Sequence, residues 1–267
     1  MSVDLRGKTA LITGGTMGIG LETALSLAGA GAQCALTYKW GTADEDAVRA
    51  RFREAGGREP LIFRADAANE EDTCELLTRL RQDHDKIDIF VSNVSAALVV
   101  NTLDDYTRKD LYRSIDYSAW PLVHYTQQIR AMFGRYPSYI IGLSSTGVDQ
   151  YAKGYDFMAA AKAVLETLCR YLNYRLQHDS VRINIVRSRN IRTQALADTF
   201  GADFERFARR FMREEHFMDA SEVGNVILAL CSGWMDGYSG QVLTVDRGMS
   251  FFDNLMRLYH EREELAL

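Results

Sequence analysis

A serine, a tyrosine and a lysine lie in the stretch from Leu143 to Lys162, L-S-S-T-G-V-D-Q-Y-A-K-G-Y-D-F-M-A-A-A-K. An apolar, strand-like run ends at Ser145, and a helical pattern that begins near Tyr155 carries Lys162. Seven residues of helix turn through about 700° and advance about 10 Å, so the phenol and the ammonium group would share one face. A nearby ammonium group lowers the pKa of a tyrosine electrostatically. The spacing therefore allows the tyrosine and the lysine to bracket a bound ligand between them.

A glycine-rich stretch near the start, Lys8 to Gly20, reads K-T-A-L-I-T-G-G-T-M-G-I-G and is followed by an apolar helical pattern up to Ala30. Glycines allow a sharp turn and a close approach to a ligand, and a helix N-terminus attracts anions. A strand, a glycine turn and a helix in this order form the context of a dinucleotide-binding loop, although ordinary turn glycines remain an alternative. The residues expected to contact the dinucleotide are Gly14, Thr16, Met17, Gly18, Ile19 and Gly20.

Three further expected strand ends carry residues that a dinucleotide could use. Lys39 and Trp40 follow the second strand, where an acidic residue would bind the ribose 2′-hydroxyl of NAD. Lys39 could instead pair with a 2′-phosphate, which favours NADPH over NADH, or it could be a solvated loop charge. The other expected contacts are Asp66 and Ala67 at the adenine edge, and Asn93 and Ser95 after the fourth strand.

The elements that must position these residues alternate between strands and helices. Strands are expected at Ala10–Ile12, Gly31–Tyr38, Leu61–Ala65, Ile87–Val91, Tyr139–Leu143, Val181–Val186 and Gln241–Val245. Helices are expected at Ile19–Ala30, Asp44–Ala55, Asn69–Asp83, Asp104–Phe133 (bent or divided near Pro121), from Tyr155 onward, and at Ser221–Leu230. This order predicts an α/β fold over residues 1–267, a single-domain Rossmann-type doubly wound parallel sheet of about seven strands with helices on both faces. Ligands of such sheets bind at the carboxyl ends of the strands.

Composition narrows the class of protein. The chain has 267 residues, 47% hydrophobic and 25% charged, and a net charge of −5, which gives a nucleic-acid partner no electrostatic support. The four separated cysteines indicate reduced thiols, and the five histidines show no ligand spacing, so no metal site is expected. Without an apolar run of membrane-spanning length, we expect no membrane partner and a cytoplasmic location.

Over roughly residues 3 to 250 the chain resembles the short-chain dehydrogenase/reductase superfamily. The matching pieces are T-G-G-T-M-G-I-G, Asp66, Asn93, Ser145, Lys162 and the I-R-T of Ile191 to Thr193. The resemblance implies coenzyme contacts from Ile191, Thr193 and Lys162, whose ammonium group would hold the nicotinamide ribose.

The usual tyrosine of that superfamily stands four residues before the lysine, and here that position is Met158. The Tyr-x6-Lys spacing of Tyr155 and Lys162 is similar to that of the enoyl-[acyl-carrier-protein] reductases of the superfamily that keep the TGxxxGxG loop. Those enzymes also have a serine ten residues and a tyrosine four residues before this tyrosine, as Ser145 and Tyr151 are here.

The resemblance implies that a hydride adds to the β-carbon of a 2-enoyl thioester, carried by acyl carrier protein or CoA, in fatty-acid-like or polyketide biosynthesis. Tyr155 would donate a hydrogen bond to the enolate oxygen, with help from Ser145. Tyr151, Met158, Phe200 and Phe204 are the expected substrate contacts. The alternatives are a carbonyl reductase with Tyr155 or Tyr151 as the acid, and a non-catalytic NADP-binding protein.

Several residues depart from the superfamily pattern. Asp116 stands where an asparagine usually serves a proton relay, Arg189 where relatives have small residues beside the nicotinamide, and Arg247 changes a late V-D-G-G to V-D-R-G. These departures predict a specialised substrate.

The segment from Gln194 to Met218 is the expected substrate lid. Phe200, Phe204, Phe207 and Phe211 would form one helical stripe, either an acyl channel or ordinary core. Arg206, Arg209, Arg210 and Arg213 would form a basic face that either docks an acidic acyl carrier protein or is merely solvated. The tail, residues 250–267, is expected to add an amphipathic helix, and the resemblance implies a homo-oligomer, a tetramer.

Overall fold

The computed structural model describes residues 3–39, 44–96, 98–189, 191–192, 201 and 203–266. Its centre is a parallel sheet in the order β3-β2-β1-β4-β5-β6-β9. The strands are β1 (Thr9–Ile12), β2 (Gln33–Tyr38), β3 (Leu61–Arg64), β4 (Ile89–Ser92), β5 (Tyr139–Ser145), β6 (Arg182–Ser188) and β9 (Val242–Val245). The expected seven-stranded parallel sheet is confirmed, with strand ends shifted by one or two residues.

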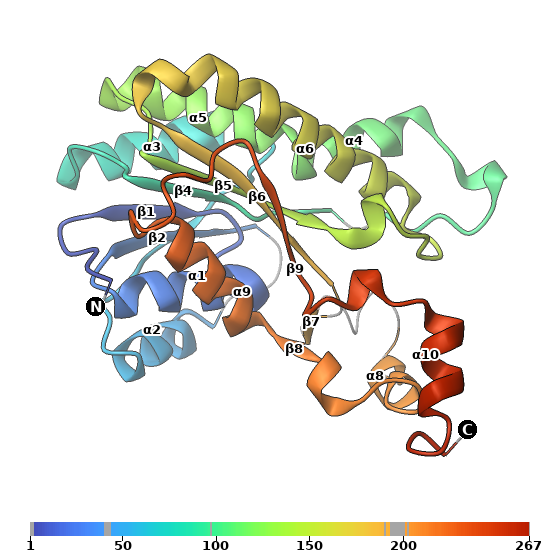
Figure 1. Cartoon of the computed structure of the whole chain (residues 1–267). Coiled ribbons are helices and arrows are strands. Elements are labelled where there is room, and N and C mark those ends of the chain that lie inside the picture. The colour runs from blue at the N-terminus through green and yellow to red at the C-terminus, as the bar shows by residue number, and fades with distance from the viewer. Residues whose placement is uncertain are drawn as a thin grey trace.

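Helices cover both faces of this sheet (Figure 1). One layer consists of α1 (Gly18–Gly29), α2 (Glu45–Glu54) and α9 (Ala220–Leu230), and the other of α3 (Glu70–Asp83), α4 (Arg108–Ser118), α5 (Trp120–Phe133) and α6 (Asp156–Leu176). Adjacent residues of β1 explain the two layers, because Ile12 packs in the core beneath α1 and α9 while Leu11 packs in the core beneath α5. Successive side chains of a strand point to opposite faces, so a strand buried on both sides is apolar throughout.

The long helical region expected around Pro121 is two helices. The backbone breaks at Ala119, and Pro121 lies in the first turn of α5, where its missing N–H has no intrahelical partner to lose. The division of this region near Pro121 is therefore confirmed.

The helical stripe expected along the lid segment is formed only in part in the described part of the chain. Only α8 (Phe204–Ala208) is helical there, and it is followed by a short 3₁₀ turn, η4 (Glu214–His216). The ends of the segment are fixed by a two-residue parallel pair, β7 (Ile191–Arg192) with β8 (Met218–Asp219), which the sequence did not predict. Phe200 and the rest of 193–200 lie outside the described residues.

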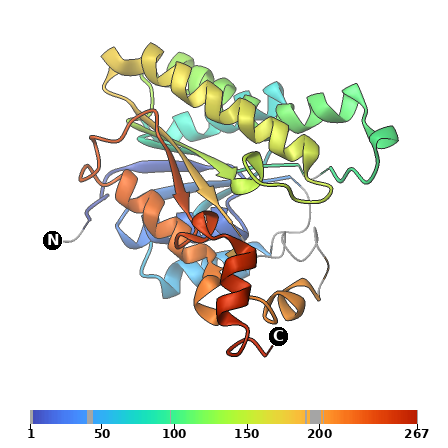
Figure 2. The ribbon, with the colours of Figure 1, turned by 45° about the vertical axis from the view of Figure 1, so that its right-hand side comes forward.

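The tail is helical in its middle only, as α10 (Asn254–Glu261) after a 3₁₀ turn, η5 (Met249–Phe251). Asp253 caps α10 by accepting a hydrogen bond from Met256 N at 3.0 Å. Arg257 Nη2 donates to the Phe211 carbonyl at 2.8 Å, so α10 lies beside the α8 segment, as Figures 1 and 2 show. No helix in the described part of the chain is long and apolar enough to cross a membrane.

Candidate active site

The glycine loop between β1 and α1 has the shape of an anion cradle. Gly14 and Gly18 have φ of +63° and +55°, a region that side chains disfavour. A Cβ on Gly20 would lie 2.3 Å from the Gly14 carbonyl oxygen, so only glycine fits there. Met17, the N-cap of α1, caps no N–H with its side chain, and no acidic residue stands in the first turn. The open amides at this helix end fit the pyrophosphate of a dinucleotide.

Asn93 holds this loop from the end of β4. Its Nδ2 donates to the carbonyl oxygens of Thr13 and Gly14, each at 3.0 Å, and its backbone N–H donates to Thr13 Oγ1 at 3.0 Å. The predicted coenzyme residue Asn93 is thus placed against the loop, where it fixes the loop's backbone.

Lys39 and Asp66, expected to contact different parts of a dinucleotide, form an ion pair with each other. The Lys39 ammonium group also donates to Tyr117 Oη at 2.5 Å, and that hydroxyl donates to Asp66 Oδ2 at 3.0 Å. Tyr117, on α4, was not expected in the site. Trp40 lies outside the described residues.

Tyr155 lies at the start of α6 against the end of β5. Its ring covers Gly147, where a Cβ would approach two ring carbons to 2.6 Å. Burial raises the pKa of Tyr155, and a hydrogen bond with Ser145 opposes the rise. The phenol is therefore protonated at neutral pH and able to donate, and the predicted pair of Ser145 and Tyr155 is brought together.

Lys162 is 4% exposed and its Nζ donates to the Leu143 carbonyl oxygen at 2.6 Å. Burial lowers the pKa of Lys162 to about 8, and the negative charge of Glu166 opposes that change. Tyr155 is the N-cap of α6 and Lys162 lies seven residues further along that helix, near the end of β5.

Met158, four residues before Lys162, is buried beside two serines. Its Sδ accepts from Ser95 Oγ at 2.9 Å and from Ser118 Oγ at 3.7 Å, and the two hydroxyls are 2.9 Å apart. The thioether fills this place and has no proton to donate.

Two of the residues that depart from the superfamily pattern, Asp116 and Arg189, differ in burial. Asp116 is exposed on α4, whereas Met158 is buried, so a proton relay from Asp116 to the Met158 position is not supported. Arg189 follows Ser188, which pairs with Ser145 of β5. Burial lowers the pKa of the Arg189 guanidinium and Asp246 opposes that effect. Arg189 makes no hydrogen bond to any other residue that the structure describes.

The other expected substrate residues that the structure describes, and the expected coenzyme residue Ile191, differ in exposure. The Tyr151 side chain is 88% exposed, and Phe204 is half-buried in α8. Ile191 is buried in β7. Thr193 and Phe200 lie outside the described residues.

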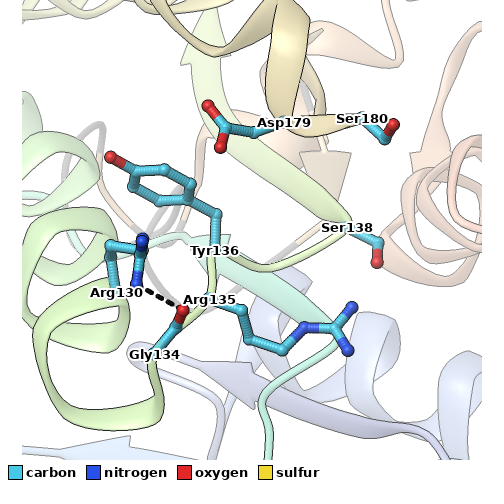
Figure 3. Close-up of a pocket in the computed structure, with 7 residues that line it drawn as sticks. All are labelled: Arg130, Gly134, Arg135, Tyr136, Ser138, Asp179 and Ser180. Carbon is cyan, nitrogen blue, oxygen red and sulfur yellow. Dashed lines mark hydrogen bonds between the residues drawn. The ribbon is translucent and has the colours of Figure 1, made fainter.

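A pocket lies at the amino end of β5 and is lined mainly by polar and charged residues. It lies before β5, between Arg130, Tyr136, Ser138 and Asp179, and Figure 3 shows Arg130 bonded to the Gly134 carbonyl. Ser138 precedes the amino end of β5, whereas Ser145 ends that strand, so this pocket is separate from the site of Tyr155.

Comparison with known proteins gives one family and consistent relatives. Residues 14–250 match the sequence model of the enoyl-(acyl carrier protein) reductase family. The chain is 27% identical to the enoyl-[acyl-carrier-protein] reductase [NADH] of Aquifex aeolicus (strain VF5), covering 98% of this chain and 96% of that one. It is 27% identical to the enzyme of the same name from Escherichia coli (strain K12), covering 92% and 95%.

Solved structures agree. A 7α-hydroxysteroid dehydrogenase in complex with NADH and 7-oxo glycochenodeoxycholic acid has a TM-score of 0.81 and 25% identity, covering 92% of this chain and 95% of that one. The Aquifex aeolicus reductase has a TM-score of 0.80 and 27% identity, covering 93% and 98%.

Proposed function

This chain belongs to the enoyl-(acyl carrier protein) reductase family of the short-chain dehydrogenases/reductases, and on that premise we propose that it reduces the C=C bond of a 2-enoyl thioester. The observation that carries the proposal is the position of the phenol relative to Lys162: it is not at the usual place on α6 but three residues earlier, at Tyr155. The position four residues before Lys162 holds the buried thioether of Met158, and the phenol beside Ser145 belongs to Tyr155.

The residues of the site divide the work as follows. The glycine loop, which Asn93 holds in place, would bind the nicotinamide dinucleotide. When bound, the dinucleotide would supply a hydride to the β-carbon, and a proton from solvent would then add to the α-carbon of the enolate and complete the reduction. Tyr155 donates a hydrogen bond to the thioester oxygen as negative charge develops there, and Ser145 holds the phenol. Lys162 places a positive charge behind this pair. A carbonyl reductase would instead need a proton donor for an alkoxide, and Met158 cannot serve as one.

For the coenzyme we propose NADH, in place of the NADPH expected from Lys39. The ammonium group of Lys39 is neutralised by Asp66 and hydrogen-bonded to Tyr117, which weakens its attraction for a 2′-phosphate. The reductases of Aquifex aeolicus and Escherichia coli are named as NADH enzymes, which favours the same choice.

For the thioester we propose an acyl-carrier-bound chain of fatty-acid-like or polyketide biosynthesis. The exposed Arg206 and Arg210 support an acidic carrier. Arg189 beside the end of β5 supports a specialised chain, and efficient turnover of simple short enoyl thioesters alone would contradict that specialisation.

The test is the oxidation of NADH and NADPH with crotonyl and acetoacetyl thioesters, using the wild type, Tyr155→Phe and Tyr171→Phe. We expect crotonyl turnover that falls about 10²- to 10³-fold in Tyr155→Phe. Tyr171, on α6 but 71% exposed, should tolerate the same change.

Turnover of acetoacetyl thioester alone would favour a carbonyl reductase, the class of the structurally similar hydroxysteroid dehydrogenase. Tight binding of the coenzyme without turnover of either substrate would favour a non-catalytic binding protein.

A further inference from the structure

A partly buried arginine, Arg187, joins three segments near the Tyr155 site. Arg187, near the end of β6, donates from Nε to Glu166 Oε1 at 2.7 Å and from Nη2 to Glu166 Oε2 at 2.6 Å. Its Nη1 forms a further ion pair with Asp149, in the connection between β5 and α6. The Arg187 and Glu166 side chains are 13% and 4% exposed, so this bidentate pair is shielded from water.

Glu166 lies one helical turn after Lys162 on α6, and both are buried. Ser144 Oγ also donates to Glu166 Oε1, at 2.6 Å. With both carboxylate oxygens engaged, Glu166 leaves the Lys162 ammonium group on the Leu143 carbonyl. Without Arg187, an uncompensated buried carboxylate would face Lys162, and the two would form a new ion pair.

We propose that Arg187 is a positioning residue, which keeps Glu166 from capturing Lys162 and ties the connection that carries Tyr155 to the sheet through Asp149. The catalytic part of this inference rests on the proposed function, because it concerns the same tyrosine and lysine. It extends that function to a residue that touches neither the coenzyme nor the substrate.

The electrostatic consequence has a definite sign. The groups that face Lys162 are Glu166 on α6, the Leu143 carbonyl on β5 and, through Glu166, Arg187 on β6. Burial lowers the pKa of Lys162 to about 8, and Glu166 opposes that change. Removing the positive charge of Arg187 therefore raises the pKa of Lys162, and removing the charge of Glu166 as well lowers it again.

The test measures Lys162 directly by NMR titration of protein labelled with ¹³C-lysine, which is practical because the chain has six lysines. Lys162→Arg assigns the resonance. We expect Arg187→Met to raise the pKa of Lys162 by about one unit or more. The double variant Arg187→Met/Glu166→Gln should return it to the wild-type value or below. This readout needs no substrate, so it is independent of whether the enoyl thioester is correct.

Activity gives the second arm. We expect kcat to fall about 10²-fold in Arg187→Met, because Lys162 is displaced, and to recover largely in the double variant. The activity lost as Lys162 deprotonates, above about pH 8 in the wild type, should move to higher pH in the single variant. Arg187→Lys is the companion variant if Arg187→Met does not fold, and should give a smaller shift of the same sign. An unchanged Lys162 pKa in the single variant, or no recovery in the double variant, would overturn the proposal.

Discussion

Met158 shows how one side chain changes the interpretation of a whole site. Its thioether accepts hydrogen bonds from Ser95 and Ser118, so the space is filled and both hydroxyls have a partner. The phenol beside Ser145 is that of Tyr155, for whose ring Gly147 leaves room. The proposed chemistry thus depends on two residues together: Met158, which fills the usual tyrosine position, and Gly147, which leaves space for the Tyr155 ring.

The choice between NADH and NADPH depends on one residue, Lys39. If Asp66 and Tyr117 hold its ammonium group, Lys39→Ala should change the KM for NADH and NADPH by similar, small factors. An ammonium group that bound a 2′-phosphate would instead make the KM for NADPH rise about tenfold while that for NADH stayed constant. Initial rates with both coenzymes decide between them. The selective tenfold loss would restore the expectation of an NADPH enzyme.

At the element scale, the structure explains the change of V-D-G-G to V-D-R-G. Arg247 has a φ of +53°, although it is not glycine. Its Nη2 donates to Glu222 Oε2 at 2.7 Å and its Nη1 to the Glu215 carbonyl, so it links the end of β9 to α9 and η4. The backbone strain is offset by contacts that glycine could not make.

We expect Arg247→Ala to be less stable than Arg247→Gly by about 1 kcal/mol, because both lose the contacts but only alanine keeps the strain. Urea unfolding of the two variants and the wild type, with a common m-value, measures the difference. Equal midpoints for alanine and glycine would show that the positive φ is not retained without the arginine side chain.

The elements also show what the sequence could and could not predict. The glycine loop and the strand ends could be predicted because the sequence marks them locally, with glycines and with apolar runs. In a parallel sheet the carboxyl ends of the strands lie at one side, so the residues that follow them could be predicted to lie near one another. The ion pair of Lys39 with Asp66 needs the register of β2 with β3, where Tyr38 faces Arg64. The pairing of Glu166 with Arg187 depends on how α6 packs on β6.

The helical stripe of phenylalanines is formed only in part for a related reason, and the assignment of residues 194–218 as a substrate lid stays a prediction. Arg192 of β7 forms ion pairs with Glu205 and Glu214. Its guanidinium carbon also lies over the Phe217 ring, 4.9 Å from the ring centroid. Such contacts between distant residues override the helical spacing of the phenylalanines. A two-residue strand such as β7 is also too short to show a period.

At the scale of the whole molecule, a net charge of −5 opposes the approach of an acidic carrier, so docking needs a local basic surface. Of the four arginines expected to form one, Arg209 is paired with Glu205 and Glu214, and Arg213 with Glu264. Arg206 and Arg210 are exposed and have no ion pair with any described residue. The predicted basic face is thus reduced to these two. The homotetramer implied by the resemblance stays a prediction.

Because Arg206 and Arg210 keep their charge available, we expect Arg206→Ala/Arg210→Ala to raise the KM for a carrier-bound enoyl thioester about tenfold at low salt, with kcat unchanged. The KM for the CoA thioester should stay the same. Arg130→Ala/Arg135→Ala is the matched control, since these exposed arginines line the separate pocket that lies before β5 (Figure 3). Rising salt should abolish the difference in KM between the wild type and Arg206→Ala/Arg210→Ala on the carrier-bound thioester. At 0.1 M salt, exposed charges are screened within about 10 Å. Equal increases in KM for both thioesters would show that the two arginines affect binding of the acyl thioester in general, and would contradict docking of the carrier protein on this surface.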